Sequence, residues 1–150
     1  MLLVNELRNY ITLLKDEIAE ITDSQTVMDD SQLSKFLKDQ PLAAVLIVGI
    51  IPKHKPKGTT DSLISQDQTS ILLLNKVDRS EMPHEAFLDN IHKMQGIARN
   101  LTNRLLDDAE NDESCGFMRY LKANTLDINP IWGLNSCDGY QIDFSLHTNF

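Results

Sequence analysis

The sequence has 150 residues, of which 41% are hydrophobic and 24% charged, a balance typical of a single globular domain. This composition argues against a collagen-like, coiled-coil or wholly disordered chain. Asp and Glu outnumber Lys and Arg by 22 to 14, which gives a formal net charge of -8. The acidic balance counts against binding to nucleic acid or an anionic membrane, although it leaves room for a local basic patch.

Cysteine usage and hydropathy indicate a soluble protein in a reducing compartment. Cys115 and Cys137 belong to no C-x-x-C pair, so a zinc site has little support, and two free thiols are favoured over a disulfide. The N-terminus reaches Glu6 without a basic segment, which argues against a signal peptide. The longest apolar run, residues 42–51, has about half the length of a membrane-spanning helix.

The N-terminal part of the chain predicts two helices separated by a loop. Residues 2–21 form an amphipathic pattern, with apolar residues three and four positions apart at Leu3, Leu7, Tyr10, Leu14, Ile18 and Ile21. Residues 22–30 are expected to form a loop. Asp30 or Ser31 then caps a short helix that ends near Lys38.

Two strands follow the short helix. Residues 42–51 are rich in β-branched side chains without polar alternation, which predicts a strand that is buried on both faces. Residues 69–77 predict a second strand, antiparallel to the first. Residues 52–68 contain prolines, a glycine and lysines, and this composition predicts a long loop between the two strands.

A long helix is predicted over residues 81–106. Ser80 is its expected N-cap and Pro83 lies in its first turn. Its apolar stripe consists of Phe87, Ile91, Met94, Ala98, Leu101 and Leu105. Residues 107–113 are mostly acidic and are expected to fray into a loop.

The C-terminal part predicts a β-hairpin. Residues 116–121 fit either a strand or a short helical turn. Residues 125–132 predict a strand whose proline lies at an edge, and residues 133–139 predict a turn closed by Asp-Gly. Residues 140–147 alternate between apolar and polar side chains, which predicts a strand with one dry face.

Together these elements predict one α+β domain over residues 1–150. Its antiparallel β-sheet has a long helix packed on one face, an N-terminal helix and a C-terminal β-hairpin, and the helices are expected on one side of the sheet.

One segment resembles a nucleotide-binding motif. Residues 75–78 read Asn-Lys-Val-Asp, the pattern with which GTPases recognise guanine at the end of a strand. Such proteins also need a glycine-rich phosphate loop, G-x-x-x-x-G-K-[ST]. Here residues 57–60 place the lysine before the glycine, so we interpret the match as chance.

The remaining reactive residues form no convincing site. His84, Asp89 and His92 lie on the long helix, where two ligands on one face do not make a metal site. Cys115 and His147 would be a thiol and a base, but no spacing brings them together.

Two further features belong to the C-terminal hairpin. Asp127 and Asp143 are expected to face solvent, with a two-carboxylate site left open. Trp132 is interpreted as a packing anchor. We therefore predict no catalytic residue, no metal ligands and no cofactor.

Two local clusters of opposite charge are candidates for an interface. One is basic and lies in the long loop, and the other is acidic and follows the long helix. The simpler interpretation of the basic cluster is a solvated loop, but opposite patches on one subunit suit a head-to-tail contact. The candidate interface residues are Lys53, Lys55, Lys57, Asp107, Asp108 and Glu110.

The order of the elements resembles that of the neck and tail-completion proteins of tailed bacteriophages, including tail-terminator proteins. These proteins open with a helix, continue with two strands joined by a long loop, and close with a second helix and a β-hairpin. Residues 138–146, Asp-Gly-Tyr-Gln-Ile-Asp-Phe-Ser-Leu, are similar to their final strand. The short helix at residues 31–38 departs from the simplest pattern.

The resemblance implies a non-enzymatic structural subunit of a homo-oligomeric ring, often a hexamer, at the head–tail junction or the tail end. Its partners would be neighbouring neck or tail proteins, in the virion or the host cytoplasm. The loop over residues 52–68 would reach the next ring or the DNA in the lumen, and a net charge of -8 is compatible with DNA that slides without sticking.

Two alternatives come from other classes of protein. One is a small bacterial adaptor or regulatory domain that dimerises through the helix at residues 2–21. The other is an enzyme with an unrecognised site.

Overall fold

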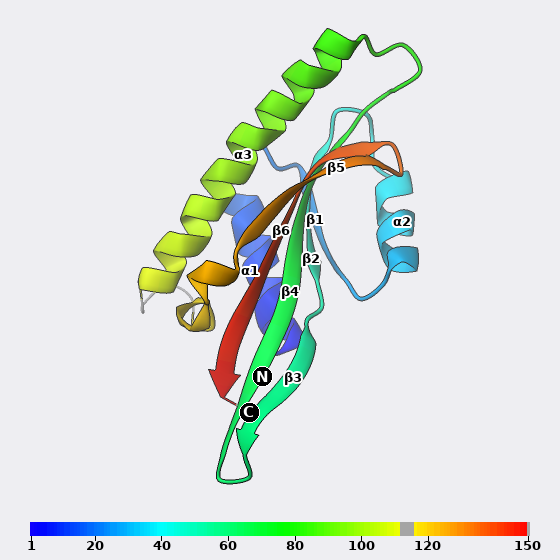
Figure 1. The fold of residues 1–150 in the computed structure, drawn as a ribbon. Coiled ribbons are helices and arrows are strands. Elements are labelled where there is room, and N and C mark those ends of the chain that lie inside the picture. The colour runs from blue at the N-terminus through cyan, green and yellow to red at the C-terminus, as the bar shows by residue number, and fades with distance from the viewer. Residues whose placement is uncertain (112–115, 150) are drawn as a thin grey trace.

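The computed structural model describes residues 1–111 and 116–149, and it confirms the α+β class (Figure 1). The elements in chain order are α1 (Val4–Glu17), β1 (Asp23–Val27), α2 (Asp30–Lys38), β2 (Val45–Ile50), β3 (Lys53–Thr59), β4 (Ser62–Lys76), α3 (His84–Glu110), the 3-10 turns η1 (Met118–Tyr120) and η2 (Ala123–Thr125), β5 (Asp127–Leu134) and β6 (Cys137–Asn149). No helix within the described ranges has the length and apolar character needed to cross a membrane.

The strands form one six-stranded sheet in the order β1-β2-β4-β6-β5, with β3 also paired to β4. The sheet is mixed, because β1 runs parallel to β2 while the other pairs are antiparallel. The strands β2 and β3 pair one after the other with β4. Residues 50–52 oppose residues 69–70 at the junction, which makes a β-bulge that bends the strand around Pro52.

Helices cover both faces of the sheet, so the expectation of helices on one side was wrong. The helices α1 and α3 pack on one face, against inward side chains such as Ile47, Leu73 and Ile142. The helix α2 packs on the other face, where its Leu33 and Leu37 join a second apolar cluster. Figure 1 shows α2 separated from α1 and α3 by the sheet. We call the sheet surface beside α2 that α2 leaves uncovered the open face.

The N-terminal helix is confirmed, but it ends at Glu17, and the predicted loop at residues 22–30 contains the strand β1. The strand was missed because polar side chains occupy most of it, as an edge strand permits. The short helix is also confirmed. Its cap is Asp29, whose carboxylate accepts a hydrogen bond from the Gln32 amide at 2.9 Å.

Residues 52–68 are not a loop. They form β3, a tight turn and the first half of β4. We call this hairpin the arm, and its tip extends beyond the end of β6 (Figure 1). Pro56 argued against a strand, yet it is tolerated because β3 pairs only with β4 and lies at an edge. The predicted antiparallel pairing of the two apolar strands is confirmed.

The long helix α3 starts later and ends later than predicted. Pro83 occupies the N-cap position, while Ser80 donates hydrogen bonds to Asp78 instead of capping the helix. The helix continues to Glu110 because Asp108 faces the core, where it has hydrogen-bond partners. The ambiguous segment at residues 116–121 contains the 3-10 turn η1.

The C-terminal hairpin is confirmed, with Pro130 in the edge strand β5. Its turn is formed by Asn135 and Ser136, both with positive φ, whereas the predicted Asp-Gly turn lies inside β6. Gly139 is required there, because a Cβ at this position would overlap the carbonyl oxygen of Leu73 on β4.

We expect Gly139→Ala to destabilise the fold by about 2 kcal/mol or more, because backbone atoms cannot yield to the added methyl group. Gly96→Ala is the matched control. Gly96 lies within α3 with open space around its Cβ position, so alanine should stabilise the helix by about 0.5–1 kcal/mol. Urea unfolding of both variants measures the difference, and equal effects would contradict the close approach of β6 to β4.

Candidate functional site

Three candidate interface lysines form a row on the open face of the arm. Even-numbered residues of β4 point to the α2 side of the sheet, as Leu72 and Leu74 do. In the arm, Lys53 lies opposite Gln68, Lys55 opposite Gln66, and Lys57 opposite Ile64. The three lysines therefore share this face, about 7 Å apart along the strand. All three are exposed.

A buried carboxylate holds the other face of the arm. The side chain of Asp67 is 0% exposed and accepts hydrogen bonds from the Leu2 amide at 2.7 Å and the Thr148 hydroxyl at 2.8 Å. Those two donors share Oδ2, while Oδ1 accepts a hydrogen bond from Ser65 and lies 2.6 Å from His54 Nδ1. These contacts join the N-terminus, β3, β4 and β6 at the base of the arm.

The electrostatics of Asp67 favour the charged form. Burial acts to raise the pKa of this carboxyl. The hydrogen bonds act in the opposite direction, the one from His54 most strongly, and together they lower the pKa. The arm is therefore anchored by an ionised group whose oxygens are fully used. Sequence reasoning missed this cluster, because nothing in the local pattern marks Asp67 as buried.

A hollow of about 850 Å³ lies on the open face between β3 and β5. Lys53 lines one side of it, and Asp127 and Asp143 line the other. The two carboxylates are cross-strand partners, so the pair left open by the sequence exists. Asp143 accepts hydrogen bonds from Ser70 and from Gln141, the latter at 2.8 Å. The open face thus carries cations on β3 and anions near β5.

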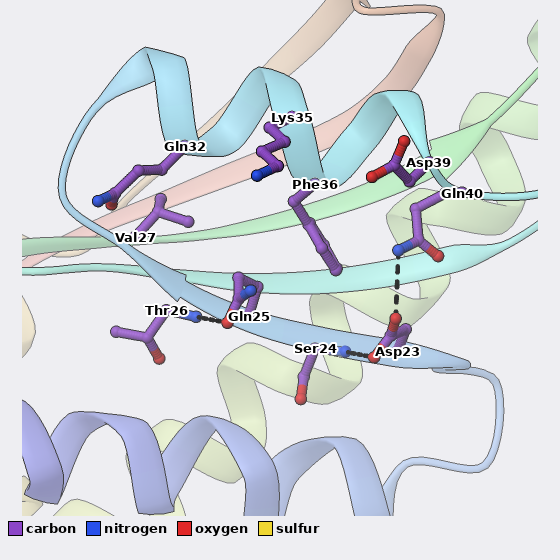
Figure 2. A pocket seen from close by; sticks show the side chains of 10 residues that line it. All are labelled: Asp23, Ser24, Gln25, Thr26, Val27, Gln32, Lys35, Phe36, Asp39 and Gln40. Carbon is purple, nitrogen blue, oxygen red and sulfur yellow. Dashed lines mark hydrogen bonds between the residues drawn. The ribbon is translucent and has the colours of Figure 1, made fainter.

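A second hollow, between β1 and α2, contains the outer edge of the sheet (Figure 2). The Ser24 amide donates to Asp23 Oδ1 at 2.8 Å, and the Thr26 amide donates to Gln25 Oε1 at 3.2 Å. Gln40 also donates to Asp23 at 3.1 Å. Side chains therefore occupy amides that another strand would need.

The other unpaired edges are protected as well. Pro56 lies in β3 and Pro130 in β5, and each removes one backbone donor from its edge. The lysines of β3 add charge repulsion against a like strand. These features disfavour the addition of a partner strand at an edge. A partner would therefore contact the faces or the ends of the molecule.

The hairpin between β5 and β6 presents the tryptophan. Trp132 is 71% exposed, so its interpretation as a packing anchor was wrong. The Arg79 guanidinium lies 4.6 Å from the centre of its ring and forms an ion pair with Asp138, which is fully buried. The edge position of Trp132, between Pro130 and Gly133, was the sequence signal for its exposure.

The predicted acidic cluster after α3 is smaller than expected. Asp107 and Glu110 are exposed, but Asp108 is only 3% exposed and cannot join a surface patch. It accepts a hydrogen bond from the Tyr10 hydroxyl at 2.7 Å and from Arg104 at 2.9 Å. The correction follows from helical geometry, because Asp108 continues the inward stripe of α3.

Side chains of the GTPase-like segment, residues 75–78, bind backbone carbonyl groups of the same chain. Asn75 donates to the carbonyl oxygens of Ala43 and Ala44 at 3.3 and 3.2 Å. Lys76 donates to that of Leu37 at 2.6 Å. The Asn and Lys side chains thus connect the start of β2 and the end of α2 to β4.

The other reactive residues do not converge. No group of three or more His, Cys, Asp or Glu side chains within residues 1–111 and 116–149 is placed to hold a metal ion. Cys115 lies outside the described residues. Cys137 is buried, and burial raises the pKa of its thiol, which keeps it protonated at neutral pH.

The comparisons with known proteins add no family. The sequence matches no protein-family model and no curated protein.

We expect Asp67→Ala to destabilise the fold by about 3 kcal/mol, because the Leu2 amide and the hydroxyls of Ser65 and Thr148 lose their acceptor. Asp89→Ala, at an exposed site on α3, should stay within about 0.5 kcal/mol. Thermal and urea unfolding measure both. A small effect at Asp67 would contradict its role as the anchor of the arm.

The same carboxylate sets a pH dependence. Its pKa is lower in the folded state than the ordinary 3.8, so its contribution is complete above that value and is lost as pH falls through the folded pKa. Below pH 3.8 the wild type should therefore lose more stability than Asp67→Asn. Parallel loss in both proteins would contradict this assignment.

Proposed function

We propose that this chain is a non-enzymatic structural subunit of a phage or prophage-like particle, which assembles into a ring at the head–tail junction or the tail end. The observation that carries the proposal is the lysine row on the anchored arm. Its partners would be further copies of the chain and neighbouring neck or tail proteins, with DNA passing through the lumen, in the virion or the host cytoplasm.

The row is a concentrated positive feature on an acidic protein. Lys53, Lys55 and Lys57 align on one strand of a chain whose net charge is -8. Like charges this close repel one another, and a negative surface relieves the repulsion. Because contacts of Asp67 fix the base of the arm, docking would order little additional backbone, and the entropic cost of association would be small.

The arrangement favours a heterologous contact, in which different surfaces of two copies meet. Such contacts close into a ring when the rotation between copies permits it. The protected edges support this geometry, because they disfavour open-ended sheet extension. Exposed Asp107 and Glu110 are one possible acceptor of the lysines.

The adaptor hypothesis has no comparable support. It depended on the apolar stripe of α1, and Leu7, Tyr10, Ile11 and Leu14 pack into the chain's own core. A dimer through this stripe would have to unpack α1 from the sheet.

We expect the purified protein to have a mass that is a multiple of the subunit mass in light scattering. Charge reversal by Lys53→Glu, Lys55→Glu and Lys57→Glu together should convert it to a monomer without loss of secondary structure. The reason is that the row would then repel its acidic partner.

The matched control is Lys35→Glu, Lys93→Glu and Lys122→Glu, which makes the same change in net charge at exposed lysines elsewhere. It should keep the wild-type mass. A wild type that stays monomeric up to about 1 mM, or equal behaviour of the two triple variants, would contradict the proposal.

A further inference from the structure

Trp132 lies at the end of the molecule opposite the arm. The strand β4 runs the length of the sheet, from Ser62 beside the arm turn to Lys76, which pairs with Cys137 next to the β5–β6 turn. Figure 1 shows the β5–β6 turn and the β3–β4 turn at opposite ends. A contact between these two features therefore requires two molecules.

The surface around Trp132 is rigid. Arg79 stacks on the ring and is held by buried Asp138, whose carboxylate also accepts the Gly133 amide at 3.0 Å. The hairpin turn is tied to α2, because Asn135 donates to the Ser34 hydroxyl at 3.0 Å. An exposed aromatic ring on a fixed support has the character of a binding hot spot, since little entropy is lost when a partner covers it.

Two carboxylates lie close in the chain to Arg79, the residue that contacts this ring. Asp78 and Glu81 lie within two positions of Arg79 in the chain, and both are exposed. Asp78 accepts hydrogen bonds from the Ser80 amide at 3.0 Å and hydroxyl at 2.6 Å, which lower the pKa of its carboxyl. The end therefore combines an aromatic face with fixed negative charge, the two features that attract an ammonium group.

We propose that Trp132, Asp78 and Glu81 form the docking surface for the lysine row of a second copy of this chain. The inference rests on the proposed function and names the acceptor of the arm. Charge complementarity supports this occupant, because the arm presents three ammonium groups on one face. The ring would receive a lysine by a cation–π contact, and the carboxylates would pair with its neighbours.

The end of α3 fits the lysines less well. Asp108 is buried there, and Arg104 places a guanidinium between Asp108 and Glu17. The local negative charge is thus partly neutralised. Asp107 and Glu110 remain exposed, but the aromatic rings at this end, Tyr10 and Phe117, are buried and present no face to a partner.

The chain reports on this contact directly, because Trp132 is its only tryptophan. Its fluorescence should shift to shorter wavelength as subunit concentration rises, in parallel with the increase in mass. The triple glutamate variant of the lysine row should keep the emission of the exposed ring at all concentrations. A mass that rises while the emission stays constant would overturn the inference.

Charge exchange provides the second test, with the dissociation constant measured by sedimentation. Trp132→Ala should weaken association at least tenfold, and Asp78→Lys with Glu81→Lys should do the same. Mixing this lysine pair with the glutamate variant of the row should restore association between the two proteins. Asp16→Lys with Glu20→Lys is the matched control, at two exposed acids in the last turn of α1 and just after it, and should change nothing.

The outcomes separate this inference from the proposed function. If the lysine row is required but the variants at Trp132, Asp78 and Glu81 associate normally, the inference is wrong and the proposed function stands. If Asp107→Lys with Glu110→Lys is the disruptive pair, the acceptor is the end of α3 and the inference is again wrong. A wild type that never associates would overturn both.

Discussion

The buried carboxylate of Asp67 is the interaction on which the shape of this molecule depends. A charge without water is costly unless donors surround it, and here the donors come from β3, β4, β6 and the N-terminus. The cluster also sets the register of the arm, because a slip of one residue would turn Asp67 to the open face. The same alternation that directs His54 inward places Lys53 and Lys55 on the opposite surface.

The protected edges of the sheet determine how a partner would contact the fixed arm. Strands with free edges tend to join other strands. Here a proline removes one backbone donor from each of β3 and β5, and side chains accept hydrogen bonds from amides of β1. An arm whose edge disfavours strand addition presents its side chains to a partner instead of its backbone. Specificity then depends on the pattern of charge and on aromatic contacts, which a one-residue shift in docking would destroy.

Much of the fold was predictable where the spacing of apolar residues within one segment marks its buried face. The stripe of α3, the buried strand β2 and the alternation of β6 all appear within a short window of sequence. The two strands that were missed share one physical cause. The strands β1 and β3 are polar, so their pairing depends on a neighbouring strand and not on propensity.

The surface residues were harder to place than the core. The lysines of the arm were recognised as a cluster, but their common face follows only from pairing with β4. Asp108 looks exposed in an acidic run, and its burial depends on Tyr10, which lies 98 positions away in the chain. Trp132 is apolar yet exposed, because Arg79 from another segment supports its ring. Contacts between distant segments determine whether each of these side chains is buried or exposed, and a local sequence pattern does not show such contacts.

The lysines of the arm and the Trp132 end of the molecule are complementary, because a cation can bind the face of an aromatic ring. Within the chain, Arg79 already places a cation on Trp132, with a buried carboxylate behind it. A lysine from another copy would repeat this arrangement on the part of the ring that solvent still reaches. Charge alone would make such a contact sensitive to salt, because exposed ion pairs are screened within about 8 Å at physiological ionic strength. The apolar area of the indole ring adds a contribution that salt does not screen, so the tryptophan, more than the carboxylates, would keep the contact intact as ionic strength rises.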